Sequence, residues 1–118
     1  MHCMTNGKTT SGKGKKMTDN KIIHNLIEEE LAEANKIHPL FQSPHEAYAV
    51  MLEEFEEVKE ELHACEKALN VTWGRVKNDI GAADLMCILK GHAVYLIQEG
   101  IQLAAMAQKT LDSLYKKG

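Results

Sequence analysis

Residues 43–62 read SPHEAYAVMLEEFEEVKEEL, and this stretch decides the fold because it opens with a complete helix-start signal. Ser43 is a favoured residue for the N-cap, and Pro44 fits the first helical position, where no backbone N–H is needed. Glu46 stands three residues after Ser43 and completes a capping box. The sequence therefore predicts that a helix begins here.

The helix that follows carries a regular apolar pattern. Apolar residues recur every three or four positions, which predicts one amphipathic helix of some seven turns that ends near Asn70. The stripe is centred on Phe55 and Leu62, so these side chains are expected to face the core. Its members stand at positions 48, 51, 52, 55, 58, 62, 65 and 69.

The same helix is unusually acidic, with eight glutamates and one lysine between residues 45 and 66. Like charges four residues apart weaken a helix, so the clustering suggests a role beyond solubility. At about 100° per residue, the glutamates near the stripe fall into two rows. One row points to solvent: Glu53, Glu56 and Glu60. The other row lies on a flank of the stripe and is placed to face a groove between two helices: Glu54, Glu57 and Glu61.

The remaining sequence also shows helical rather than strand periodicity. A helix is expected to begin after Thr18 or Asp19 and to end before Pro39, because the residue preceding proline resists the helical conformation. Two further helices are expected, over 71–91 and 92–115. The predicted fold class is all-α, and the predicted architecture is an antiparallel four-helix bundle.

Charge and composition place the chain among single-domain proteins. Residues 1–17 are rich in Gly, Thr and Lys and are expected to form a flexible basic tail, with one helical domain over 18–118. Residues 1–20 carry four lysines against one aspartate, and the rest carries 10 basic and 16 acidic residues, a net charge of −6. An acidic domain argues against a nucleic-acid partner. No apolar run is long enough to span a membrane, and three widely spaced cysteines fit a reducing cytoplasm.

The last predicted helix offers an acidic counterpart to the glutamate flank. Glu99 is the only acidic residue between Asp84 and Asp112. Carboxylates from two helices that enter one groove would form a hard, oxygen-rich site, which suits Mg²⁺ or Mn²⁺ better than Zn²⁺. The alternative interpretation is a solvated acidic face with no metal, on a protein that acts through interactions alone.

Three segments resemble a known enzyme family. Leu52-Glu-Glu-Phe-Glu-Glu57 fits the E-E-x-x-E helix motif of the MazG-like, all-α nucleoside triphosphate pyrophosphohydrolases. The segment 99–107, EGIQLAAMA, resembles their second motif, E-x-x-D followed by small and apolar residues. The approach to the acidic helix, HPLFQSPHE over 38–46, looks like that of small phage and prophage members.

The resemblance implies a fold, an activity and a set of ligands. Members are helical bundles that associate as homodimers or homotetramers, and they split a nucleoside triphosphate into monophosphate and pyrophosphate with the help of magnesium. Carried over to this chain, the metal ligands are Glu53, Glu54, Glu57 and Glu99, with the amide oxygen of Gln102 as a fifth. Glu54 and Glu57 are also the expected catalytic residues.

Gln102 departs from the pattern, because the family has aspartate at that position. An amide oxygen can bind magnesium but brings no charge and cannot act as a base. Glu61, one turn beyond Glu57 on the same flank, is a third expected catalytic residue that could replace the missing charge. The alternative is a relative that has lost turnover and survives as a helical oligomer that binds nucleotide or protein.

Overall fold

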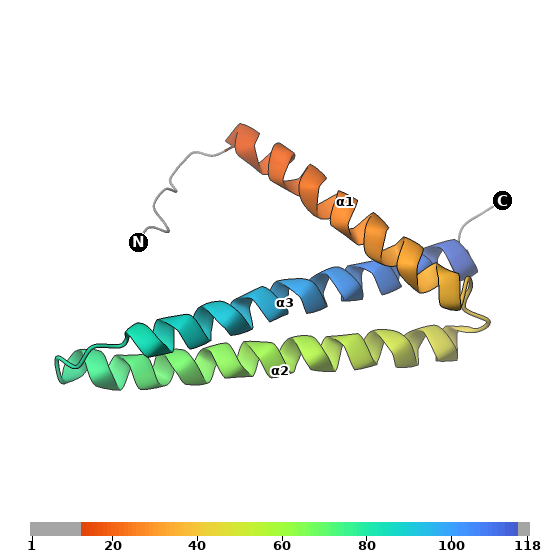
Figure 1. Cartoon of the computed structure of the whole chain (residues 1–118). Helices are drawn as coiled ribbons and strands as arrows, with labels where there is room; N and C mark the ends of the chain where they lie inside the picture. The colour runs from red at the N-terminus through yellow and green to blue at the C-terminus, as the bar shows by residue number, and fades with distance from the viewer. Residues whose placement is uncertain (1–12, 116–118) are drawn as a thin grey trace.

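The computed structural model describes residues 13–115, with side chains over 20–115, and within that range it is helical without strands. The first helix, α1, spans Lys13–Ile37; α2 spans Pro44–Lys77; and α3 spans Ala83–Thr110 (Figure 1). A short π-helical segment, η2, covers Leu111–Tyr115 and ends the described chain. The all-α class is confirmed, but the described chain has three long helices where the sequence predicted four.

The predicted start of α2 at Ser43 and Pro44 is confirmed, but the Glu46 side chain bonds the residue before the cap and not the N–H of Ser43 itself. The Ser43 hydroxyl accepts a hydrogen bond from the Glu46 backbone N–H at 3.2 Å, and Pro44 occupies the first turn. The Glu46 carboxylate accepts from the Gln42 backbone N–H at 2.7 Å. The first bond satisfies a donor that a helix N-terminus otherwise leaves without a partner, and the second fixes the chain that enters the helix.

The two predicted breaks at Asn70 and Gly91 do not occur, because α2 and α3 run through them. A glycine inside a helix costs only about 1 kcal/mol relative to alanine, which packing along a long helix can offset. At Gly91 no neighbouring atom lies within 4 Å of where a Cβ would stand, so no close approach requires the glycine there.

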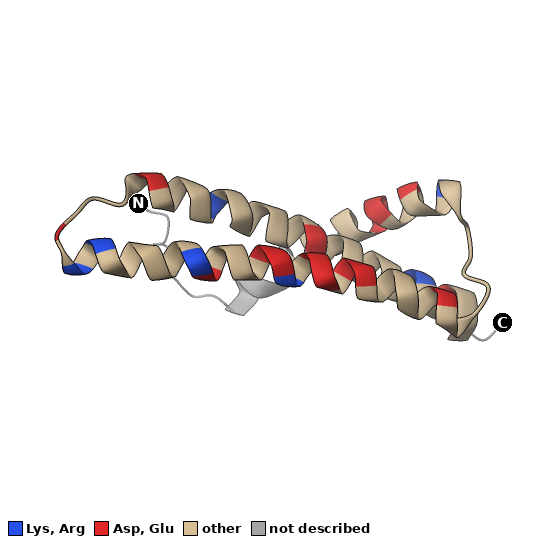
Figure 2. Cartoon of the chain, turned by 90° about the horizontal axis from the view of Figure 1, so that it is seen from below, with Lys and Arg blue, Asp and Glu red and all other residues tan. Residues whose placement is uncertain are grey.

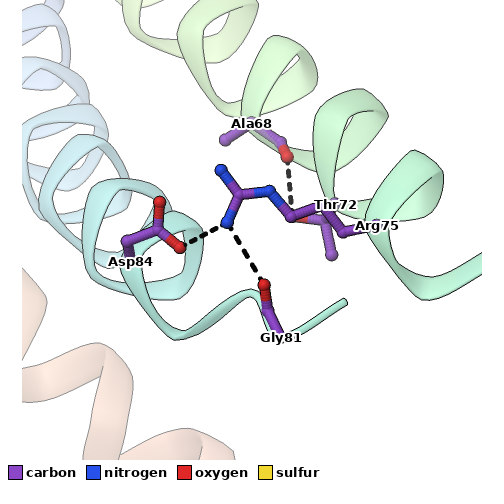
Figure 3. Close-up of polar contacts among 5 residues, drawn as sticks. All are labelled: Ala68, Thr72, Arg75, Gly81 and Asp84. Carbon is purple, nitrogen blue, oxygen red and sulfur yellow. Dashed lines mark hydrogen bonds and ion pairs between the residues drawn. The ribbon is translucent and has the colours of Figure 1, made fainter. Parts of the chain in front are cut away.

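The loop that separates α2 from α3 covers residues 78–82 instead, and Arg75 stabilises it through hydrogen bonds. The Arg75 guanidinium donates to the Asp84 carboxylate at 2.7 Å and to the Gly81 carbonyl at 3.2 Å (Figure 3). The Ile80 backbone N–H donates back to the Arg75 carbonyl at 2.8 Å. Asp79 takes a left-handed backbone conformation with φ of 55°, which turns the chain sharply enough for α3 to return beside α2.

The bounds of α1 differ from the prediction at one end only. It ends at Ile37, before Pro39, as expected, and the His38 backbone N–H still donates to the Ala34 carbonyl at 3.1 Å. It begins at Lys13, before the predicted caps at Thr18 and Asp19. Residues 13–17, expected in the tail, are therefore helical, and the rest of that tail lies outside the described residues.

The helices form a long α2–α3 hairpin that α1 crosses near one end (Figure 1). The core lies at that crossing and consists of Phe41, Ala47, Ala105 and Met106. The Phe41 backbone N–H donates to the Ser113 hydroxyl at 3.0 Å, which ties the α1–α2 connection to η2. No helix in the described part of the chain is long and apolar enough to cross a membrane.

The apolar stripe of α2 does not form the core that its periodicity predicted. Phe55 is 46% exposed and Leu62 is 56% exposed. The residues that α2 does bury are small: Ala47, Cys65 and Ala68. Small side chains let the backbones of two helices approach closely, so α3 packs about a quarter turn away from the centre of the stripe.

Candidate metal centre

Three carboxylates from two helices meet midway along the α2–α3 hairpin. Glu54 and Glu57 project from α2 and Glu99 from α3, each half-buried, and each offers one oxygen within 4.8 Å of the others. Figure 2 shows acidic residues gathered along the middle of α2, with an acidic position of α3 beside them. The structure thus brings together the three residues on which the predicted metal site depends.

The division of the glutamates into two rows is confirmed. Glu54, Glu57 and Glu61 are half-buried, as expected of side chains beside a second helix. The solvent-facing row is exposed throughout: Glu53, Glu56 and Glu60. Glu53, which the family resemblance named as a metal ligand, lies outside the group of three carboxylates at ligand distance.

Two of the three carboxylates, Glu54 and Glu99, have a raised pKa. Burial, a hydrogen bond to Glu57 and the negative charges of Glu57, Glu54 and Glu61 raise the pKa of Glu99 to about 7. Burial, followed by the charges of Glu57, Glu53 and Glu30, raises the pKa of Glu54 above its usual value. The arrangement therefore disfavours full ionisation, and either protons or a cation would stabilise it.

Gln102 lies directly against this group. With its amide nitrogen turned toward the carboxylates, it donates to Glu54 Oε1 at 3.0 Å and to Glu99 Oε1 at 3.1 Å. The two donors of one amide thereby bridge α2 and α3. The opposite orientation of the same amide would present its oxygen, which is the atom that a metal ion would bind.

Glu61, the third expected catalytic residue, has a hydrogen-bond partner that is not one of the expected metal ligands. Its carboxylate lies 2.7 Å from His92 Nδ1 on α3, so it is held by a histidine outside the three-carboxylate group. Its charge still contributes to the raised pKa of Glu99. The sequence analysis gave His92 no part in the site, although its position seven residues before Glu99 puts both on one face of a helix.

A groove between α1 and α3 opens beside the carboxylates and has a volume of about 470 Å³. The wall from α1 is acidic and contains Glu29, Glu30 and Glu33, and α3 contributes Gln98 and Gln102. Sequence reasoning missed these α1 glutamates. The three-residue spacing of Glu30 and Glu33 shows that they share one face of a helix. It does not show which helix that face packs against.

Comparisons of the chain with models of known protein families, with curated proteins and with solved structures find no match. The resemblance to the MazG-like enzymes therefore stays a prediction that rests on the motif residues themselves.

Proposed function

We propose that this protein is a cytoplasmic nucleoside triphosphate pyrophosphohydrolase of the MazG-like type that depends on Mg²⁺ or Mn²⁺. The single observation that carries the proposal is the convergence of Glu54, Glu57 and Glu99 from two helices. Two of these residues belong to the first family motif and one to the second, and the motifs are separated by more than 40 residues of chain.

The donor set fits a hard divalent cation. Ligand oxygens around Mg²⁺ stand about 2.1 Å from the ion, so oxygens on opposite sides of it are about 4.2 Å apart. The carboxylate oxygens of this group all lie within 4.8 Å of one another, so small side-chain movements would bring them to that spacing. Glu54, Glu57 and Glu99 would hold the ion, and Gln102 would join them once its amide turns.

The groove beside the carboxylates is a suitable place for the substrate. Its volume of about 470 Å³ is within the range of small-molecule sites in proteins. The groove wall is acidic, so a triphosphate would be repelled there without a cation. A bound divalent cation would neutralise part of the phosphate charge and make the α-phosphorus easier to attack.

Glu61 is the residue proposed to take the proton of the attacking water. The hydrogen bond from His92 orients the Glu61 carboxylate, and Glu61 lies one turn from Glu57 on the same row. The water oxygen forms a bond to the α-phosphorus, the bond from that phosphorus to the α–β bridging oxygen breaks, and one water proton goes to Glu61. The products are a nucleoside monophosphate and pyrophosphate.

One observation favours a second candidate function. The Gln102 amide already satisfies Glu54 and Glu99 with hydrogen bonds, which stabilises the group without a cation. A protein with this arrangement would bind a nucleotide or another protein without turnover. The second candidate is therefore a non-catalytic binding module of the same fold.

The test is a pyrophosphate-release assay over a panel of ribo- and deoxyribonucleoside triphosphates, with Mg²⁺ or Mn²⁺ and with EDTA. We expect release that needs the cation and that Glu57→Gln abolishes, while the matched change Glu60→Gln on the exposed row leaves it intact. Nucleotide binding without product would establish the binding module instead. Neither product nor binding across the panel would overturn both candidates.

A further inference from the structure

Lys109 on α3 is a lysine that the fold keeps away from solvent. It is only 4% exposed, although lysine side chains normally extend their ammonium group into water. Within the described part of the chain, no residue forms an ion pair or a side-chain hydrogen bond with this ammonium group. Its close partner is the ring of Phe41, whose centroid lies 4.7 Å from Lys109 Nζ. An aromatic face attracts a cation but does not supply the full negative charge of an anion.

The Lys109 side chain lines a pocket at the crossing of α1 over the α2–α3 hairpin (Figure 1). The pocket has a volume of about 240 Å³. Its apolar walls come from every helix and from the α1–α2 connection: Ala34 of α1, Phe41 of the connection, Val50 of α2 and Met106 of α3. A buried cation at an apolar pocket is the kind of polar group that fixes the orientation of a small ligand.

The other charged or polar side chains around the pocket do not neutralise Lys109. They are Glu46 and His38, and both are exposed. The Glu46 carboxylate accepts a hydrogen bond from the Gln42 backbone N–H at 2.7 Å and forms no ion pair with Lys109. His38 carries no negative charge in either protonation state. An occupant with one negative charge would therefore supply what the described residues do not.

The pocket indicates the chemistry of that occupant. A carboxylate fits better than a phosphate, because a phosphate dianion needs more charge and more donors than one lysine offers. The rest of the ligand is apolar, since the walls beside Lys109 are hydrocarbon, aromatic ring and thioether. At about 30 Å³ for each water-sized group, the volume of about 240 Å³ holds roughly eight non-hydrogen atoms. Hexanoate is a carboxylate of that size.

This pocket is separate from the groove beside the three carboxylates. The two have no lining residue in common. Lys109 stands ten residues after Glu99 on α3, which separates them by about 15 Å along the helix axis. A ligand in the pocket is therefore independent of the proposed enzymatic function.

We propose that the pocket at the α1 crossing binds a small monocarboxylate with an apolar body. The ligand carboxylate pairs with the Lys109 ammonium group, and the apolar body packs against Phe41, Val50 and Met106. The ligand then contacts α1, α2 and α3 together, so its binding stabilises the position of α1 on the hairpin by mass action.

The first experiment titrates the full chain, labelled with ¹³C at the methionine methyl groups, with hexanoate and follows it by NMR. The Met106 methyl resonance should shift and saturate, whereas Met86, twenty residues earlier on α3, should not move. Acetate carries the charge without the apolar body, and 1-hexanol carries the body without the charge. Each should bind at least about 10-fold more weakly than hexanoate. No shift of Met106 with hexanoate, or equal affinity for either matched compound, overturns the proposal.

The second experiment removes the buried charge. Lys109→Met keeps the length of the side chain and should lower the affinity for hexanoate at least about 10-fold. Its Tm without ligand should exceed that of the wild type, because a buried cation that lacks an anion is gone. Lys90→Met, at an exposed lysine of the same helix, should change neither quantity. Wild-type affinity in Lys109→Met, or a fall in its ligand-free Tm, contradicts the role given to this lysine.

The third experiment fills the pocket and leaves its charge in place. Ala34→Leu extends a side chain into the pocket from α1, so we expect weaker hexanoate binding and a smaller rise in Tm with hexanoate. The matched control is Ala49→Leu, at an exposed alanine of α2 outside the pocket, which should bind as the wild type does. Circular dichroism checks that both variants are helical. Unchanged binding to Ala34→Leu would place the ligand elsewhere on the molecule and overturn the proposal.

Discussion

The amide nitrogen of Gln102 on α3 lies 3.0 Å from a carboxylate oxygen of Glu54 on α2 and 3.1 Å from one of Glu99. This bridge joins two carboxylates whose pKa values are both raised, so it offsets part of their repulsion. A cation in the same place would do so more strongly, because it carries full positive charge. The Gln102 bridge therefore reduces the repulsion between the carboxylates that a metal ion would otherwise neutralise.

Replacement of Gln102 by aspartate tests that role, with Gln102→Asn as the control of the same shape and no charge. In EDTA, Gln102→Asp is expected to have the lower Tm, because a fourth carboxylate adds repulsion. In Mg²⁺, it is expected to show the larger gain in Tm and faster pyrophosphate release. The measurements are thermal unfolding and the release assay. Equal behaviour of the two variants in both media would show that charge at this position is irrelevant.

Binding of a divalent cation should stabilise the fold by mass action. At a cation concentration one hundred times its Kd, the expected gain in the free energy of unfolding is about 2.7 kcal/mol. Glu57→Gln removes one of the three carboxylates and should reduce this gain, while Glu60→Gln, on the exposed row, should keep it. Calorimetric scans with Mg²⁺, Mn²⁺ or EDTA provide the comparison. A Tm that does not respond to either cation contradicts the metal site.

The raised pKa of Glu99 predicts a pH dependence of stability in the cation-free protein. The folded chain holds the Glu99 proton up to a pH of about 7, whereas the unfolded chain releases it near 4.5. Stability therefore falls as the pH rises from about 4.5 to 7 and is not further affected by this group above that range. Glu99→Gln removes the effect, so its Tm advantage over the wild type should grow from pH 5 to pH 7.5.

The measurement is thermal unfolding in EDTA at a series of pH values. Glu60→Gln serves as the control, because its side chain is exposed and its advantage should not follow this pattern. A Glu99→Gln advantage that is constant between pH 5 and 7.5 would mean that Glu99 titrates normally.

Phe41 should be the most sensitive core position of the α1–α2 connection. It is 6% exposed, packs with Ala47, Ala105 and Met106, and would leave a cavity at the helix crossing if truncated. Phe41→Ala is expected to cost about 3–5 kcal/mol in the free energy of unfolding. The neighbouring Leu40 is 55% exposed, so Leu40→Ala should change the stability by no more than about 0.5 kcal/mol. Chemical denaturation of both variants gives the comparison, and similar losses would contradict the assigned core.

The local features of the fold were predictable from the sequence because they depend on neighbouring residues. The Ser43 cap, the end of α1 before Pro39 and the two glutamate rows follow from helix geometry and capping chemistry alone. The α2–α3 break was not predictable in the same way. It depends on Arg75, which reaches Gly81 and Asp84 across the loop, and no periodicity reports such a contact.

The identity of the packed faces was predictable only in part. Periodicity showed that Phe55 and Leu62 share an apolar side of α2, but it cannot say whether the same chain covers that side. The proximity of Glu54, Glu57 and Glu99 was expected and is found, because both motifs lie on faces that antiparallel helices turn toward each other. The contributions of Glu30 and His92 depend on which helices their faces meet, and helical spacing alone does not give that.

The unbroken course of α2 from Pro44 to Lys77 restricts how the length of this chain can change during evolution. Inserting or deleting one residue between Glu57 and Cys65 would rotate everything beyond it by about 100°, separating the glutamate row from the face that packs on α3. A change in the length of the loop over residues 78–82 would not rotate one part of a helix relative to another. Homologous sequences should therefore keep a constant length through α2 and vary in length at this loop.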